Sequence, residues 1–115
     1  MPIVIKRAYE PAQAADGYRV LVDRLWPRGL TKEKLRLDAW MKDVSPSNAL
    51  RKEFHGQPTR WVDFERRYFN ELGAQQTLIG ELRNKARTAT VTLVYAARDQ
   101  TRNNAAALKN YLEKS

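Results

Sequence analysis

Two stretches of the chain are rich in apolar and β-branched residues, which is the pattern of strands buried on both faces. They span residues 19–25 and 90–96, and residues 3–7 form a third, shorter stretch that alternates apolar and less apolar side chains. Within the first strand, Val20 and Val22 are expected on one face, and Leu21 on the other face with Asp23.

Between and after these strands the apolar residues recur with the helical period. The spacing predicts helices over residues 59–72, 75–86 and 102–113, and Gly73 ends the first of them. One face of that first helix carries an apolar stripe that we interpret as core packed against the sheet: Trp61, Phe64, Tyr68 and Leu72.

Two shorter helices are predicted from their capping residues. Thr31 is a good N-cap for residues 31–35, and Ser47 is a good N-cap for residues 48–54. The segment 37–44 fits a helical spacing and an alternating one equally well, and the Ser-Pro step that follows it favours a strand or an extended segment.

The order of the elements indicates the fold class. Strands come first, then a helical middle, a buried strand and a terminal helix. This order predicts an α/β protein, a small single domain over residues 1–115, with a mostly parallel sheet flanked by helices. The long helical crossover between residues 19–25 and 90–96 predicts that these two strands are adjacent and parallel.

Composition narrows the classes of protein. The chain has 115 residues, enough for one domain, and 43% of them are hydrophobic, which supports a packed core. The absence of cysteine excludes disulfides, cysteine nucleophiles and zinc sites built on thiolates. The N-terminal segment is too short and too soon charged for a signal peptide, and no apolar run approaches membrane-spanning length, so we expect a cytoplasmic protein that does not enter membranes.

The charge balance points to anionic partners. Lysine and arginine number 21 against 13 acids, a formal net charge of +8. Such a balance favours phosphates, nucleotides, nucleic acid or acidic surfaces. Because the cations are spread along the predicted elements, most of them are interpreted as solubilising.

The predicted strand ends carry arginine and aromatic side chains together. In an open parallel sheet the carboxyl ends of the strands share a crevice, so these side chains are expected to converge there. Arginine suits bidentate binding of phosphate or carboxylate, and aromatic rings beside it suit a planar ring. The start of the last helix would add backbone N–H donors for an anion. The predicted ligand-binding residues are Arg7, Tyr9, Arg24, Trp26, Arg28, Tyr95, Arg98 and Asn103.

A purely structural interpretation of the same residues stays open. Asp23 with Arg24, or Arg98 with Asp99, would form ion pairs that fix loops to the sheet. The Trp-Pro step that begins at Trp26 would form a rigid turn packed on the core.

Acid–base chemistry has few candidate residues. Asp23 and Asp99 are the acids at the predicted crevice, where neighbouring arginines are expected to hold both ionised and so to favour binding or orienting roles. His55 is the only histidine, and its position in a break after a short helix favours a helix cap over a catalyst. No spacing indicates a metal site, and no glycine pattern indicates a phosphate loop or a dinucleotide fold, so neither metal nor cofactor is expected.

Four segments, taken in order, resemble the YeaO-like proteins, which belong to a broader family named only as a domain of unknown function: DGYRVLVDRLWPRG, AWMKDVSPS, LRKEFHG, and TLVYAARD followed by Asn103. The resemblance covers nearly the whole chain and implies a compact, bacterial-type cytoplasmic α/β domain, without an activity, substrate or cofactor. Relatives often open the last helix with Asn-His-Ala where this chain has Asn103-Asn104-Ala105, which argues against an imidazole-dependent mechanism here. The matching motif residues are Arg7, Tyr9, Asp23, Arg24, Trp26, Pro27, Arg28, Trp40, Lys42, Pro46, Ser47, Phe54, Tyr95 and Asn103.

These observations favour a protein that binds a small anionic ligand, such as a nucleotide or a phosphate ester, at the strand ends. They leave open whether the protein also acts on that ligand. The alternatives are a nucleic-acid-binding module and a protein-interaction domain. Without a helix-turn-helix or zinc-finger signature, binding to nucleic acid is expected to be weak and non-specific. The residues indicate no oligomeric state.

Overall fold

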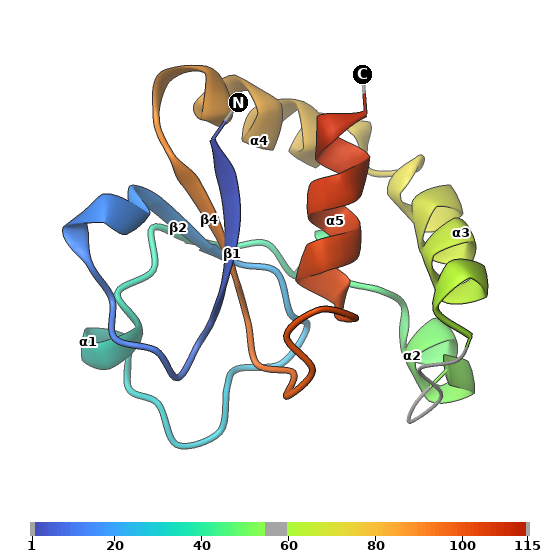
Figure 1. Cartoon of the computed structure of the whole chain (residues 1–115), viewed down its shortest axis with the longest axis horizontal. Helices are drawn as coiled ribbons and strands as arrows, with labels where there is room; N and C mark the ends of the chain where they lie inside the picture. Colours follow the sequence, from blue (N-terminus) through green and yellow to red (C-terminus); the bar gives the residue numbers. More distant parts are fainter. Residues whose placement is uncertain (1, 55–59, 115) are drawn as a thin grey trace.

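The computed structural model describes residues 2–54 and 60–114, and Figure 1 shows the path of the chain. Its strands are β1 (Ile3–Arg7), β2 (Tyr18–Leu21), β3 (Ala39–Trp40) and β4 (Val91–Tyr95). Its α-helices are α1 (Lys32–Leu35), α2 (Asn48–Phe54), α3 (Trp61–Leu72), α4 (Gln76–Thr88) and α5 (Asn104–Glu113), and short 3-10 helices span Ala14–Asp16 and Lys42–Val44. In the described ranges no helix combines the length and the apolar character that crossing a bilayer requires.

The strands form a parallel sheet in the order β1-β4-β2-β3. β4 is buried along its whole length and lies between β1 and β2. Tyr18 lies opposite Val91 and Leu21 lies opposite Val94, so the predicted pairing of the two apolar strands is confirmed. Because the strands are parallel, the segments that follow β1, β2 and β4 leave the sheet at the same edge, the lower one in Figure 1.

β2 ends at Leu21, earlier than the predicted end at residue 25. The ladder with β4 gains one further bond, from Val22 N to Val94 O at 3.1 Å. At the next position the carboxylate of Asp23 accepts the Ala96 N–H at 2.9 Å, where a backbone carbonyl would continue the strand. The end of β2 is therefore set by a side-chain hydrogen bond, which the apolar pattern does not encode.

The two faces of the sheet are covered differently. α4 packs on β4, and α5 packs on both β1 and β4, over the face that carries the main core (Figure 1). Val20 and Val22 belong to that core, whereas Leu21 packs with Val94 and Leu35 on the opposite face. The predicted facing of these β2 residues is confirmed.

The two short helices begin at the N-cap residues predicted from the sequence. Thr31 Oγ1 accepts the Lys34 N–H at 3.2 Å at the start of α1, and Ser47 Oγ accepts the Leu50 N–H at 3.1 Å at the start of α2. The ambiguous segment 37–44 contains the two-residue strand β3 followed by a 3-10 turn.

The apolar stripe on α3 is buried as predicted only in the C-terminal half of the helix. Tyr68 and Leu72 are buried, and the Tyr68 hydroxyl donates to Val44 O. Trp61 and Phe64 are half-buried, and the helix packs mainly on α2 and α5. The interpretation of the whole stripe as core is thus correct for Tyr68 and Leu72, whereas Trp61 and Phe64 have a second, exposed side. The predicted start of this helix at residue 59 lies outside the described residues.

A buried ion pair holds α1 against the sheet. Asp16 accepts from Arg19 Nη1 at 2.7 Å and from Lys6 Nζ at 3.1 Å. The remaining Arg19 donors, Nε and Nη2, bind Leu35 O at 3.1 and 2.8 Å. Since each charged group has a partner, this cluster is structural.

Candidate functional site

A groove of about 890 Å³ opens at the carboxyl ends of β2 and β4. On the sheet side it is lined by residues 23–28, by residues 96 and 97 and by the start of α5. On the helical side it is lined by α2 and by the start of α3. The groove lies where the predicted crevice was expected, and its volume falls within the range of about 300–1,000 Å³ that is usual for small-molecule sites.

Cationic side chains outnumber acids around this groove. Among the described residues, those that line it are Arg24, Arg28, Arg51, Lys52 and Arg102, against the acids Asp23 and Asp99. Arg24 and Arg28 belong to the predicted set. Arg51 and Lys52, which come from α2, do not, although the LRKEFHG motif contains both. The excess of positive charge favours an anion in the groove.

Arg24 has an unusual environment. The residue is half-buried, and its Nε is a buried donor without a hydrogen-bond partner in the part of the chain that the structure describes. It forms none of the ion pairs found there, so the expected pair with Asp23 is absent. A buried guanidinium N–H without an acceptor is suited to receive an oxygen from a ligand.

Three predicted residues do not line the groove. Arg7 donates from Nε to Ala97 O at 3.0 Å and from Nη2 to Ala96 O at 3.4 Å, and so ties β1 to the end of β4. Arg98 lies on the exposed turn after β4. Tyr95 is only 2% exposed because its place on the strand directs it into the core. Strand-end position alone does not decide which side chains reach the groove.

Aromatic rings line the same groove. They are Tyr9, Trp26, Phe54, Trp61 and Phe64. The Tyr9 hydroxyl donates to Arg28 O at 3.0 Å, which fixes the loop that carries Trp26. Trp61 and Phe64 lie 5.5 Å apart between ring centroids at an interplanar angle of 22°. These two stacked rings line the helical side of the groove, a role that the helical stripe in the sequence does not predict.

Asp23 lies on the sheet side of the groove, with a protein donor on each carboxylate oxygen. Oδ2 accepts the Ala96 N–H at 2.9 Å, and Oδ1 accepts Asn104 Nδ2 at 2.8 Å. Burial raises the pKa of Asp23 above its usual value, against the opposing effects of these hydrogen bonds and of Arg51. Arg51 does lower this pKa, as expected of a neighbouring arginine, but desolvation has the larger effect.

Asp99 stabilises the loop before α5. Its Oδ1 accepts the Arg102 N–H at 2.9 Å, the Thr101 N–H at 2.9 Å and the Thr101 hydroxyl at 3.0 Å. These backbone donors, first that of Arg102, lower the pKa of Asp99. The group is held ionised as expected, mainly by backbone N–H groups. No ion pair between Asp99 and Arg98 occurs among the described residues.

The start of α5 contributes two asparagines to the groove. Asn103 is the N-cap, since its Oδ1 accepts the Ala106 N–H at 2.8 Å, while its Nδ2 donates to Asp99 O at 2.9 Å. Asn104 Nδ2 donates to Val22 O at 3.1 Å as well as to Asp23. Asn104 thus links α5 to the end of β2.

In residues 2–54 and 60–114 no group of three acidic or histidine side chains could hold a metal ion. His55, the remaining acid–base candidate, lies outside the described residues.

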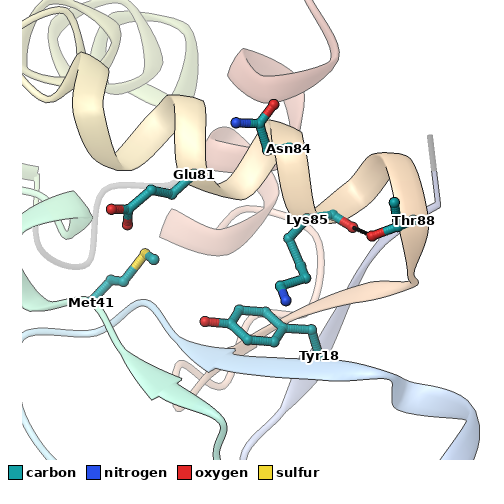
Figure 2. A pocket seen from close by; sticks show the side chains of 6 residues that line it. All are labelled: Tyr18, Met41, Glu81, Asn84, Lys85 and Thr88. Carbon is teal, nitrogen blue, oxygen red and sulfur yellow. Dashed lines mark hydrogen bonds between the residues drawn. The ribbon is translucent and has the colours of Figure 1, made fainter.

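A second hollow, of about 400 Å³, lies between α4 and the sheet and contains none of the predicted site residues (Figure 2). Lys85 Nζ lies over the Tyr18 ring at 4.8 Å from its centroid, and Glu81 and Met41 line the other end. Since the charges here are mixed and the cation already contacts a ring, the groove at the strand ends remains the stronger candidate site.

The family of the chain follows from sequence comparison. A family model described as "Inactive DUF488-N3 subclade" matches residues 2–115. The chain belongs to this family. It is 44% identical over 112 residues to "Uncharacterized protein YeaO" of Escherichia coli (strain K12), covering 97% of each protein. It is also 44% identical over 108 residues to "Uncharacterized protein Rv3073c" of Mycobacterium tuberculosis (strain ATCC 25618 / H37Rv), covering 94% of this chain and 91% of that protein. These matches confirm the resemblance to YeaO-like proteins, and no solved structure matches the chain.

Proposed function

We propose that this protein binds a small anionic ligand that carries a planar ring, of the nucleotide or phosphate-ester class, in the groove at the strand ends. The observation that carries the proposal is the gathering of cationic and aromatic side chains around one groove. Arginines form charge-assisted hydrogen bonds with phosphate, and aromatic rings stack on a planar base. The carboxyl edge of a parallel sheet is also the usual place for ligands in α/β folds.

The Arg24 donor that has no partner among the described residues adds to this support. Leaving a buried donor unsatisfied costs about 1–3 kcal/mol, and more when the group is charged. A phosphate oxygen placed against Arg24 Nε would remove that cost. The interaction energy would then include relief of a penalty that the free protein carries.

Binding is favoured over turnover. The carboxylate oxygens of Asp23 already receive hydrogen bonds from Ala96 and Asn104, and Asp99 is held by its own loop. Both groups thus help to hold the end of β2 and the loop before α5 in place, which favours orienting roles over general acid work. The description of the family as inactive supports the same conclusion.

The test is thermal denaturation of the purified protein with adenosine 5′-monophosphate, inorganic phosphate or neutral adenosine. A ligand present at about one hundred times its Kd stabilises the folded state by about 2.7 kcal/mol, which raises the Tm by about 10 °C in a protein of this size. We expect the monophosphate to give the largest shift, because it engages both the cations and the rings.

Three variants locate the site. Arg28→Ala should reduce the shift strongly, because it removes a cation that lines the groove and can contact the phosphate. The fold should be preserved, because the exposed Arg28 side chain has no hydrogen bond among the described residues. Arg24→Lys keeps the charge but removes Nε, and should also weaken binding. Arg87→Ala, an exposed arginine on α4 away from the groove, serves as the control and should leave the shift unchanged. Absence of a shift with the monophosphate, or equal shifts in all variants, would refute the proposal.

A further inference from the structure

We propose, resting on the function proposed above, that the ligand is a ribonucleotide and that Asp23 and Asn104 accept hydrogen bonds from its ribose hydroxyls. The two residues form an acceptor pair on the sheet side of a groove whose other charged side chains, within the described ranges, are all cationic except Asp99. This juxtaposition assigns a sugar-binding subsite within the groove.

The first acceptor is the amide oxygen of Asn104. The amide nitrogen donates to Val22 O and to Asp23 Oδ1. Because a backbone carbonyl can only accept, Val22 O fixes which end of the amide is the nitrogen. The amide oxygen is left without a hydrogen bond in the described part of the chain, although Asn104 is half-buried and lines the groove. It is therefore an oriented acceptor that the fold itself does not use.

The second acceptor is the carboxylate of Asp23. Each of its oxygens receives one protein hydrogen bond, from Ala96 N and from Asn104 Nδ2. A carboxylate offers about four lone-pair sites, so each oxygen retains one. The two protein donors hold the group in place, and the half-buried side chain stays accessible from the groove.

The chemistry of this pair indicates what it binds. Lysine and arginine have no acceptor, so the cations of the groove can bind a phosphate but cannot bind a hydroxyl donor. The acceptor pair repels an anion and attracts neutral donors. A ribonucleotide presents phosphate oxygens, a planar base and, between them, vicinal hydroxyls. These three parts match the cations, the rings and the Asp23–Asn104 pair.

The experiment compares matched nucleotides by calorimetric titration of the full chain. The probes are adenosine and uridine 5′-monophosphates and their 2′-deoxy forms. Loss of a hydrogen bond to a charged acceptor weakens binding by about tenfold or more, so each deoxy form should bind about tenfold more weakly than its ribose counterpart. We expect the same ratio of ribose to deoxy affinity for adenosine and uridine monophosphates, because both carry the same ribose hydroxyls. A ratio that differs between the two bases would indicate that a group of the base takes part in the contact.

Variants test which residues read the sugar. Asn104→Ala and Asp23→Asn should bring the ratio of ribose to deoxy affinity close to one, whereas the exposed Asn84→Ala should keep it. If Asp23→Asn does not fold, as judged by circular dichroism, the wild type and Asn104→Ala decide alone. Equal binding of ribose and deoxy forms to the wild type, or an unchanged ratio in Asn104→Ala, overturns this inference while the proposed function stands. No binding of any monophosphate overturns both.

Discussion

Replacing Gly17 with alanine should destabilise the fold severely, because this residue brings the start of β2 against β4. Its φ of 64° and ψ of −125° lie in a region that residues with a side chain rarely adopt. A Cβ at this position would lie 2.4 Å from Thr90 O and 3.1 Å from Thr90 Cβ. Thr90 O also accepts the Tyr18 N–H at 2.8 Å, which begins the ladder between the strands. Relief of the clash therefore requires the loss of that hydrogen bond or a shift of β2.

The magnitude combines two effects. Backbone strain in a sparsely populated region costs about 1–3 kcal/mol. Forcing an extra carbon into a packed site costs about 1–3 kcal/mol more. The free energy of unfolding should thus fall by about 2–6 kcal/mol, a large part of the 5–15 kcal/mol or so that stabilises a typical domain.

Urea denaturation followed by circular dichroism measures this loss, and Gly80→Ala provides the matched control. Gly80 lies inside α4, and a Cβ added there meets no neighbouring atom within 4 Å. Alanine is favoured over glycine by about 0.5–1 kcal/mol within a helix, so this variant should be slightly more stable than the wild type. A Gly17→Ala protein within about 0.5 kcal/mol of the wild type would show that the close approach to Thr90 does not exist in solution.

Three further predictions concern the core, the acid at the groove and nucleic acid. Trp61→Ala should cost about 1–2 kcal/mol in urea melts, because Trp61 is half-buried, whereas Tyr68→Ala should cost about 3–5 kcal/mol, and equal losses would contradict the placement of α3. Because burial raises the pKa of Asp23, the folded state holds this proton more tightly than the unfolded chain does. The stability of the wild type relative to Asp23→Asn should therefore be greatest below the usual pKa of an aspartate and should decline as the pH rises through the raised pKa of the folded state, and a difference that is independent of pH would oppose this. Binding to DNA or RNA should be independent of sequence and should weaken steeply between about 50 and 200 mM salt; submicromolar affinity for one sequence at physiological salt, with scrambled controls much weaker, would instead favour a nucleic-acid function.

The parallel sheet could be predicted because its central strands carry their burial in their own composition. Residues 91–95 are apolar or β-branched throughout, and the structure buries all of them. The end of β2 could not be predicted in the same way. It depends on the carboxylate of Asp23 meeting the N–H of Ala96, which is 73 positions away along the chain. The apolar pattern indicates which residues are buried, but not where a side-chain carboxylate replaces a backbone carbonyl as the acceptor of a ladder hydrogen bond.

The sheet side of the candidate site was more predictable than its helical side. Arg24, Trp26 and Arg28 follow directly from the end of β2, so the parallel arrangement predicts them near the groove, although the same argument also predicted residues that do not line it. Arg51 and Trp61 come from helices whose position depends on how α2 and α3 pack beside the sheet. In the sequence a cation on a helix resembles a solvated surface, and an aromatic stripe resembles core. Only the tertiary arrangement shows that both side chains border a groove.

The end of β2 and the candidate site share one residue, and this has a consequence for how the site can vary. Asp23 ends the strand, positions Asn104 at the start of α5 and presents an acceptor to the groove. A substitution at Asp23 therefore changes stability and the proposed sugar recognition together. Arg28 carries no such structural bond from its side chain within the described residues, so a substitution there changes the charge of the groove alone. We therefore expect that substitutions at Arg28 can change ligand affinity without changing the fold. The preference for ribose over deoxyribose assigned to Asp23 and Asn104 depends instead on the hydrogen bonds that end β2.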